Sequence, residues 1–391
     1  MMKEKLRIET YMKNRVTYLD LAKGIGIILV VLGHMENISS ELRIWISSFH
    51  MPLFFVISGM LLALKGADKP IINDVKSGDE MKIFVVKTAK GLLVPYFWFS
   101  LIYIPIDIMN LFIHNVDTHT FIQNILDSLT FSGVSVMWFL PALFLAEIVA
   151  MFIISRARKY PLMIVFSLSL SVISYVIWTN IKLLYDAYSS IYFFATTLGF
   201  VRVFLRAITL NVHVVIGFLM YKLIEYAKDK WIKDNDNRVR GFDIAAGVIL
   251  FVVNMGLCLK NGAVDNHFLT LNNLFLYYLC AFIGSMAIIL ICKGINSIPF
   301  IEYFGKNSLI IMATHLQCYI LYAGILIAIA IDAYVTRAKS YVYMFNSVVF
   351  TMLIEVAIIT VINRFFPFIT GKGSIKDLLK ITTTSSYIHR E

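Results

Sequence analysis

The first apolar segment of the chain carries side chains suited to acid–base and anion chemistry. Lys23 and His34 stand eleven residues apart, which in an α-helix places them on one face about 16 Å from each other. Asp20 lies on the same stripe, three residues before Lys23, and can form an ion pair with it. Histidine suits general-base catalysis near neutral pH, whereas an ordinary interfacial ion pair and a solvated histidine would produce the same spacing. The pattern therefore predicts a general base, His34, on the same helix face as the cation Lys23. An ordinary interfacial ion pair with a solvated histidine remains the alternative.

Three more polar side chains interrupt apolar segments. His50 follows His34 after a short loop, so the two should lie near each other on the outer half of the protein. Glu147 lies well inside an apolar segment, and His315 lies seven residues after Ser308, on the same helix face. Ionisable groups inside a bilayer indicate function by default. His50 could position an acceptor or only cap its helix, and His315 could face either the bundle or lipid.

Several cationic side chains are expected on the cytoplasmic half of the membrane domain, where they could neutralise the charge of a phosphate-bearing ligand. Lys23, Lys87 and Lys90 are placed there by the order of the segments. Lys306, Asn307 and Ser308 stand at the expected start of another helix, where backbone N–H groups attract anions.

Arg202 and Arg206 form a separate pair, four residues apart and on one helix face. They could bind an acidic sugar or a lipid phosphate, or anchor a helix at the membrane interface.

These residues permit one simple mechanism. His34 accepts the proton of an attacking hydroxyl group as a general base. Glu147 or Asp20 either orients the imidazole or holds a lysine.

Composition identifies the elements that must position these groups. Of 391 residues, 59% are hydrophobic and 15% are charged, and the mean hydropathy is +0.76. Soluble domains contain roughly 45–50% apolar and about 25% charged residues. A soluble protein could not bury this much apolar surface, so the chain is expected to be an all-α polytopic membrane protein.

The four cysteines lie in apolar stretches without CxxC spacing, so neither a disulfide framework nor a metal site is expected.

A membrane-spanning helix needs about 20 mostly apolar residues, and we expect ten such helices in one domain, residues 17–366. They are Thr17–Gly33, Ile44–Leu64, Leu92–Ile113, Met137–Ser155, Pro161–Trp178, Ile208–Leu223, Gly241–Leu259, Asn272–Cys292, Ser308–Ile331 and Val342–Phe366. Residues 1–16 and 367–391 are expected as cytoplasmic tails, and the apolar stretch Phe193–Phe204 as a re-entrant or interfacial helix. With this topology most of the 35 lysines and arginines lie inside. The net charge of +10 is then an orientation signal and not a nucleic-acid-binding surface.

Together these pieces resemble the membrane-bound acyltransferase 3 family, especially its fucose 4-O-acetylase-like branch. The matching pieces run in order through residues 15–315: Leu19-Asp20-Leu-Ala-Lys23-Gly24, His34 after ten intervening residues, His50-Met-Pro-Leu-Phe-Phe-Val-Ile-Ser58-Gly59, the basic run before Pro95-Tyr96, Trp138-Phe139-Leu140, Gly305-Lys306-Asn307-Ser308, and His315. The ten-helix count also agrees with the core of this family.

The resemblance implies an O-acyltransferase, usually an acetyltransferase, in the bacterial inner membrane. It would use acyl-coenzyme A, typically acetyl-CoA, to modify sugars of envelope polysaccharides, with His34 as the essential histidine. Lysine stands at positions 23, 87 and 90, where the family often has arginine, so the bidentate fork for phosphate is lost there. About 25 residues follow the last span, too few for the soluble esterase-like domain that some members carry.

The rival interpretation is a transporter or flippase for a polysaccharide intermediate, but the two halves show no matching pair of spans broken by Gly or Pro. The sequence specifies neither the acceptor sugar, nor the acyl group, nor the oligomeric state.

Overall fold

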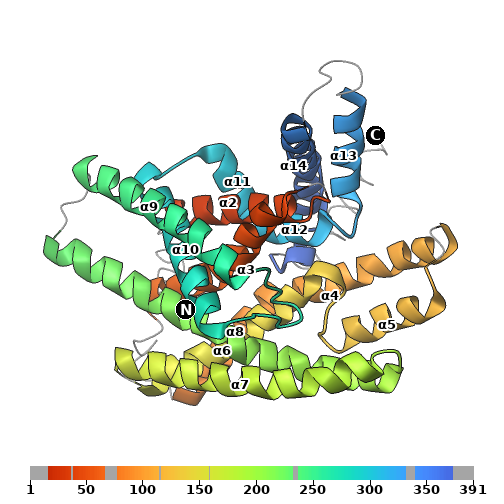
Figure 1. Ribbon diagram of the computed structural model, residues 1–391, viewed down its shortest axis with the longest axis horizontal. Helices are drawn as coiled ribbons and strands as arrows, with labels where there is room; N and C mark the ends of the chain where they lie inside the picture. The colour runs from red at the N-terminus through yellow and green to blue at the C-terminus, as the bar shows by residue number, and fades with distance from the viewer. Residues whose placement is uncertain are drawn as a thin grey trace, which may run out of the picture.

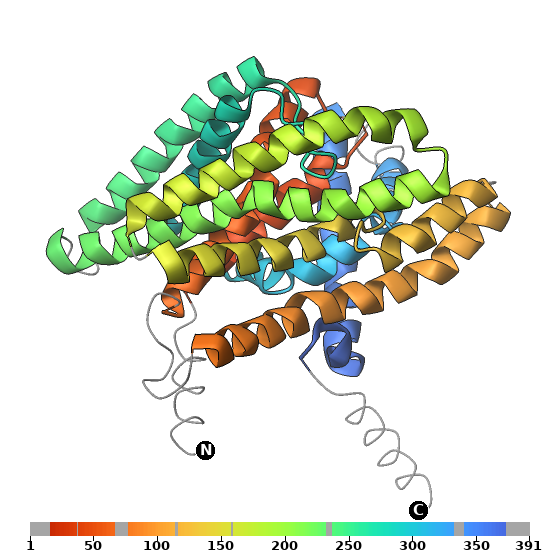
Figure 2. The ribbon, with the colours of Figure 1, turned by 90° about the horizontal axis from the view of Figure 1, so that it is seen from below.

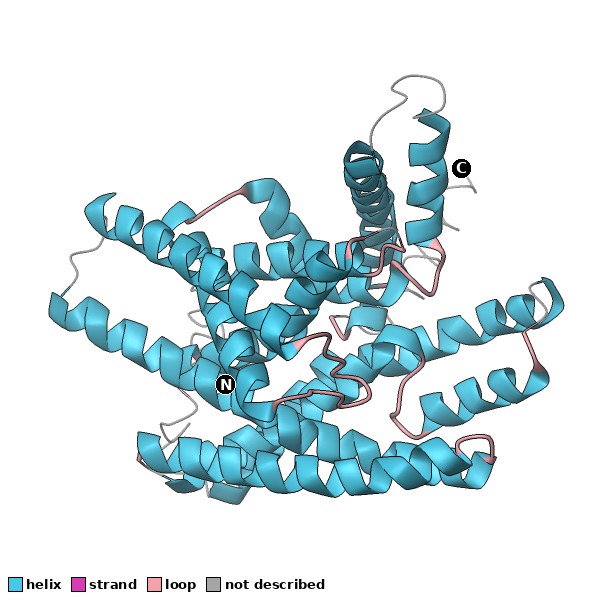
Figure 3. Cartoon of the chain, viewed as in Figure 1, coloured by secondary structure: helices cyan, strands magenta, loops and turns pink. Residues whose placement is uncertain are grey.

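The computed structural model describes residues 16–36, 38–66, 77–113, 116–157, 159–231, 237–331 and 340–372. Residues 1–15 and 373–391, which make up most of the two predicted tails, lie outside the described residues. The described part is helical throughout, with no β-strand (Figure 3).

The helices, in chain order, are α2 (Thr17–Gly33), α3 (Ser40–Leu64), α4 (Ser77–Ile113), α5 (Thr118–Leu129), the 3₁₀ turn η1 (Ser135–Trp138), α6 (Phe139–Ala157), α7 (Tyr160–Tyr188), α8 (Tyr192–Trp231), α9 (Asn237–Asn261), α10 (Leu274–Ile295), α11 (Pro299–Lys306), α12 (Ser308–Thr314), α13 (Ile320–Ile331), α14 (Ser340–Phe365) and the 3₁₀ turn η3 (Pro367–Thr370).

Each of the ten predicted segments contains a helix, and the protein is an all-α polytopic membrane protein. Within the described ranges, eight helices are long and apolar enough to cross a membrane: α3, α4, α6 with η1, α7, α8, α9, α10 and α14. The other two segments differ from these in length. Helix α2 has 17 residues, and the predicted ninth span is divided between α12 and α13.

Two expectations about individual segments were wrong. The ninth span is not a continuous helix over Ser308–Ile331, because it breaks at residues 315–319, where Tyr319 has a φ of +59°. The stretch Phe193–Phe204 is not a separate re-entrant helix but the first third of the continuous helix α8. It contains no proline, and a continuous helix satisfies its backbone hydrogen bonds within the segment, as lipid requires.

Helix α3 lies at the centre of the bundle and packs against α2, α8 and α10 (Figure 1). Helices α7 and α8 run side by side along one face, as both ribbon views show (Figure 2). Glycines let α3 and α8 approach closely, because a Cβ at Gly59 would lie 1.9 Å from the Val214 carbonyl oxygen. On α8, a Cβ at Gly217 would lie 1.9 Å from the Val56 carbonyl oxygen.

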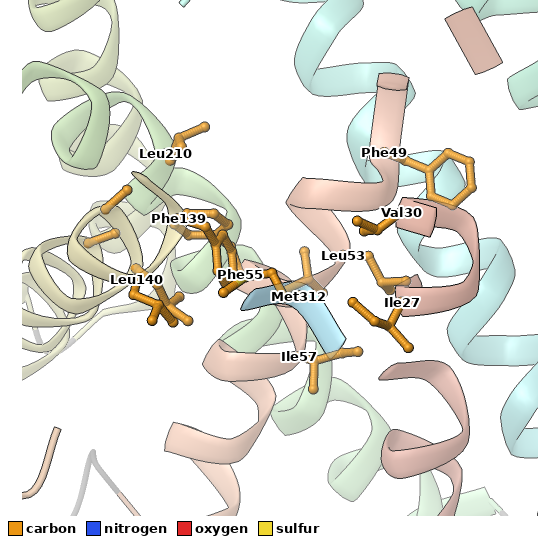
Figure 4. Packing of buried hydrophobic residues seen from close by; sticks show 14 of the residues in the cluster. Ile27, Val30, Phe49, Leu53, Phe55, Ile57, Phe139, Leu140, Leu210 and Met312 are labelled. Atoms are coloured by element: carbon orange, nitrogen blue, oxygen red, sulfur yellow. The ribbon is translucent and has the colours of Figure 1, made fainter. Parts of the chain in front are cut away.

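The apolar core beside α3 collects side chains from helices that are distant in sequence (Figure 4). Ile27 and Val30 of α2 meet Leu53 of α3, and Phe139 of α6 and Met312 of α12 complete the cluster. These buried side chains fix the relative positions of the helices that carry the polar candidates.

Candidate active site

Two histidines that are distant in sequence form a pair at one end of the bundle. His34 is the residue that ends α2, and its side chain is exposed. His315 follows α12 directly, in the turn that breaks the predicted ninth span, and is fully buried. Their ring centroids lie 5.3 Å apart with an interplanar angle of 47°. His315 therefore faces the bundle, which settles the alternative that its sequence position left open.

The hydrogen bonds of His315 define its tautomer. Its Nδ1 lies 2.8 Å from the Ile311 carbonyl oxygen and 2.9 Å from that of Met312. Carbonyl oxygens only accept hydrogen bonds, so Nδ1 carries the proton. Its Nε2 is buried and has no hydrogen-bond partner among the described residues. In the neutral ring this Nε2 is an acceptor held at a fixed orientation.

His50 belongs to the same cluster. Its Nδ1 donates to the Ile46 carbonyl oxygen at 2.7 Å, and His34 is its electrostatic neighbour. The expected proximity of His34 and His50 is thus present in the structure. No group of metal-ligating side chains suited to a metal ion occurs in the described ranges.

A cavity of about 260 Å³, here called the central cavity, lies below this histidine cluster between α2, α3, α6 and α12. Its polar lining consists of Lys23, Ser58, Lys65, Glu147, Lys306 and Ser308. Its apolar lining includes Val30, Met51 and Met312, each within one helical turn of one of the three histidines. The central cavity therefore has lysines in its lining and comes within one helical turn of each histidine position, although none of the three histidines lines it.

A second cavity, of about 430 Å³, adjoins the first and is called the lysine cavity. Its lining includes Lys87, Lys90, Lys306, Asn307 and Lys372. Lys306 and Leu309 line both cavities. The donor-binding candidates are therefore brought together around two adjacent spaces, with Lys306 between them.

The two candidate carboxylates lie away from the histidines. Asp20 is buried and forms an ion pair with Lys23 at 3.6 Å. It precedes His34 by fourteen residues, about 21 Å along the helix, so it cannot orient that imidazole. Glu147 accepts a hydrogen bond from the Ser58 hydroxyl in the central cavity. Of the two roles expected for a carboxylate, Asp20 fills the one of holding a lysine.

The three residues expected at a helix start have different surroundings. Lys306 forms an ion pair with Glu302 at 3.5 Å, and Asn307 is bound within the fold, donating from Nδ2 to the Tyr303 carbonyl oxygen at 2.8 Å. Ser308 lines the central cavity at the start of α12, which has only seven residues. The fixed dipole expected from a long ninth helix is therefore absent here.

Sequence reasoning missed Ser58, Lys65 and Lys372 as cavity residues. Ser58 and Lys65 lie on or just after α3, about two and four helical turns beyond the candidate His50, so helical spacing could have found them. Lys372 was assigned to the tail, whereas η3 and residues 371–372 pack against α4. Arg202 and Arg206 line neither cavity.

The base of the central cavity depends on a glycine contact between α2 and α11. A Cβ at Gly305 would lie 1.8 Å from the Asp20 carbonyl oxygen. We therefore expect Gly305→Ala to destabilise the protein by about 1–3 kcal/mol and to weaken ligand binding in the cavity, measured by thermal unfolding and ligand titration. Gly256→Ala on α9 is the control, because its Cβ meets nothing within 4 Å. Equal stability of the two variants would contradict the close contact.

Comparison with known proteins gives one match. The model of a family described as an acyltransferase domain matches residues 16–363. Neither the curated proteins nor the solved structures contain a match to the chain.

Proposed function

Since that match covers nearly the whole chain, the protein belongs to the acyltransferase 3 family, and we propose that it transfers an acyl group, usually acetyl, from acyl-coenzyme A to a sugar hydroxyl of a cell-envelope polysaccharide. As an acyltransferase with several apolar membrane helices, it is a multi-pass membrane enzyme. A bacterial inner membrane is the proposed location.

One observation carries this proposal: the central cavity is lined by lysines and extends to residues within one helical turn of the histidine cluster. Lys23, Lys65 and Lys306 line one end, where they can neutralise the phosphates of coenzyme A. The arm between the diphosphate and the thioester of coenzyme A is long and uncharged, which suits the apolar middle of the cavity. The thioester would then lie beneath the histidine cluster.

The reaction uses His34 as the general base. The acceptor hydroxyl oxygen bonds to the acyl carbon as its proton passes to His34. The carbon–sulfur bond then breaks, and the sulfur takes the proton from His34 and leaves as free coenzyme A. His34 is exposed, so a sugar can approach it from outside the bundle, while the neighbouring neutral His315 helps to stabilise the charged imidazole.

The proposal is tested with the purified full chain, labelled acetyl-CoA and a panel of envelope glycans. Label on a glycan and release of free coenzyme A at a matching rate support it. Movement of a glycan across liposomes without label transfer would instead indicate a transporter.

The lysine cavity gives a prediction about the donor. We expect the double variant Lys87→Ala, Lys90→Ala to raise the KM for acetyl-CoA about thirtyfold with little change in kcat, because both side chains are exposed and the two lost phosphate contacts, at about 1 kcal/mol each, sum to about 2 kcal/mol. Initial rates at a series of donor concentrations measure this.

Lys82→Ala is the matched control, since Lys82 is an exposed lysine of the same helix that lines neither cavity. If Lys82→Ala raises KM as much as the double variant, the lysine cavity is not the donor site.

A further inference from the structure

Arg202 and Arg206 of α8 lie inside the protein, at 2% and 0% exposure. Their guanidinium groups rest on aromatic rings. The Arg202 Cζ lies 4.6 Å from the ring centroid of Phe268 and 4.9 Å from that of Tyr185, and the Arg206 Cζ lies 5.0 Å from that of Trp138. This burial is incompatible with the alternative that they anchor a helix at the membrane interface, because an anchoring arginine would reach water.

Most of the N–H groups of this arginine pair have no acceptor. Nε and Nη1 of Arg202, and Nε and Nη2 of Arg206, are buried without a hydrogen-bond partner in the described part of the chain. The hydrogen bond that Arg206 does make, from Nη1 to the Trp138 carbonyl oxygen, is long at 3.4 Å. No ion pair of either arginine occurs among the described residues.

The nearest carboxylates are bound to other groups. Asp127 and Asp265 both lie within electrostatic range of Arg206. Asp127 accepts from Gln123 Nε2 at 2.9 Å. Asp265 accepts from the backbone N–H groups of His267 and Phe268 at 2.7 and 3.1 Å. Neither acid forms an ion pair that would satisfy the arginine donors.

Further unpartnered polar atoms surround the pair. His267 Nε2 and Ser132 Oγ are buried without a partner among the described residues. The His267 ring stacks on Trp138 at a centroid distance of 5.6 Å and an interplanar angle of 5°. Ser132 lies against α8, since its Oγ would be 3.0 Å from a Cβ at Gly199. The site thus combines two fixed cations with several hydrogen-bonding groups.

A buried charge without a partner is strongly destabilising, and two adjacent guanidinium groups repel each other. An oxyanion would compensate both, since the planar fork of arginine binds a carboxylate or a phosphate through two hydrogen bonds. The site also adjoins the proposed reaction centre: Trp138 belongs to η1, and η1 contacts α12, the helix that His315 ends.

We propose that Arg202 and Arg206 bind the anionic group, a carboxylate or phosphate, of an acidic acceptor glycan and so hold its hydroxyl near the histidine cluster. This inference rests on the proposed function, because it names the chemistry of the acceptor.

The test measures binding and not turnover. Thermal unfolding of the purified full chain is followed with glucuronic acid, glucose 1-phosphate and, as the neutral match, glucose. We expect at least one acidic sugar, and not glucose, to stabilise the wild type, and Arg206→Gln to weaken that binding at least tenfold. Arg206→Lys keeps the charge without the fork and should be intermediate. Coenzyme A binding should remain unchanged in both variants, which also shows that they are folded.

Three results would overturn the proposal. The first is a wild type that binds none of the acidic sugars, and the second is binding that Arg206→Gln leaves intact. The third is stabilisation of the wild type by phosphatidylglycerol alone, lost in the variant, which would assign the arginines to a lipid headgroup. If Arg206→Gln does not fold, the comparison of Arg202→Lys with wild type decides by the same criteria. Sugar binding without any acyl transfer would contradict the proposed function and leave the arginine site standing.

Discussion

His34→Ala is expected to reduce acyl transfer by at least a factor of about 10², with the protein still inserted and folded. The side chain is exposed and the backbone N–H of residue 34 bonds to the carbonyls of Val30 and Val31, so alanine keeps the local hydrogen bonds and leaves no buried cavity. The loss should appear in kcat and not in the KM for the donor, because His34 itself does not line the central cavity proposed to bind the donor. The nearest lining residue on α2 is Val30, one turn before it. Label transfer from acetyl-CoA to a glycan measures it.

The control for this variant is His119→Ala. His119 stacks on Tyr192 at 4.3 Å and lines neither cavity, so its removal should leave the transfer rate unchanged. Coenzyme A binding and thermal stability of His34→Ala should match the wild type. A His34→Ala protein that transfers label at the wild-type rate would remove His34 from the mechanism.

The sequence was sufficient to predict the helices and the alignment of groups along one of them. Helix α2 has the predicted bounds Thr17–Gly33, because a continuous apolar run in a membrane has few alternatives to a helix. The spacing of Lys23 and His34 followed from the helical repeat alone. Local periodicity therefore predicted what lies on a single helix.

Contacts between helices were harder to predict. The pairing of His34 with His315 joins positions 281 residues apart, and depends on a break in the ninth span that no Gly or Pro marks within residues 315–319. Burial of Arg206 depends on η1 and on the loop that carries His267. A hydropathy profile shows both only as connections between the apolar segments. The role expected for Asp20 at His34 failed because helix length separates them.

His315→Asn is the second variant expected to lose most of its activity, by a factor of about 10² in kcat. The amide nitrogen of asparagine can replace Nδ1 as donor to the Ile311 and Met312 carbonyls, which His315 now satisfies. It provides nothing at the position of Nε2. The turn that ends α12 should thus persist, and thermal stability and the KM for acetyl-CoA should stay close to wild type. Wild-type kcat in this variant would show that His315 only holds the turn.

His315→Gln distinguishes two ways in which Nε2 can act beside His34. The glutamine side chain reaches the position of Nε2 with an amide oxygen, which accepts a hydrogen bond but does not take a proton at neutral pH. If Nε2 only accepts a hydrogen bond from the charged His34 ring, the Gln variant should recover part of the rate lost in the Asn variant. If Nε2 itself receives the proton, both variants should be equally slow, because neither amide side chain can take a proton at neutral pH. His34 and His315, whose ring centroids lie 5.3 Å apart, would then be two bases of one proton relay.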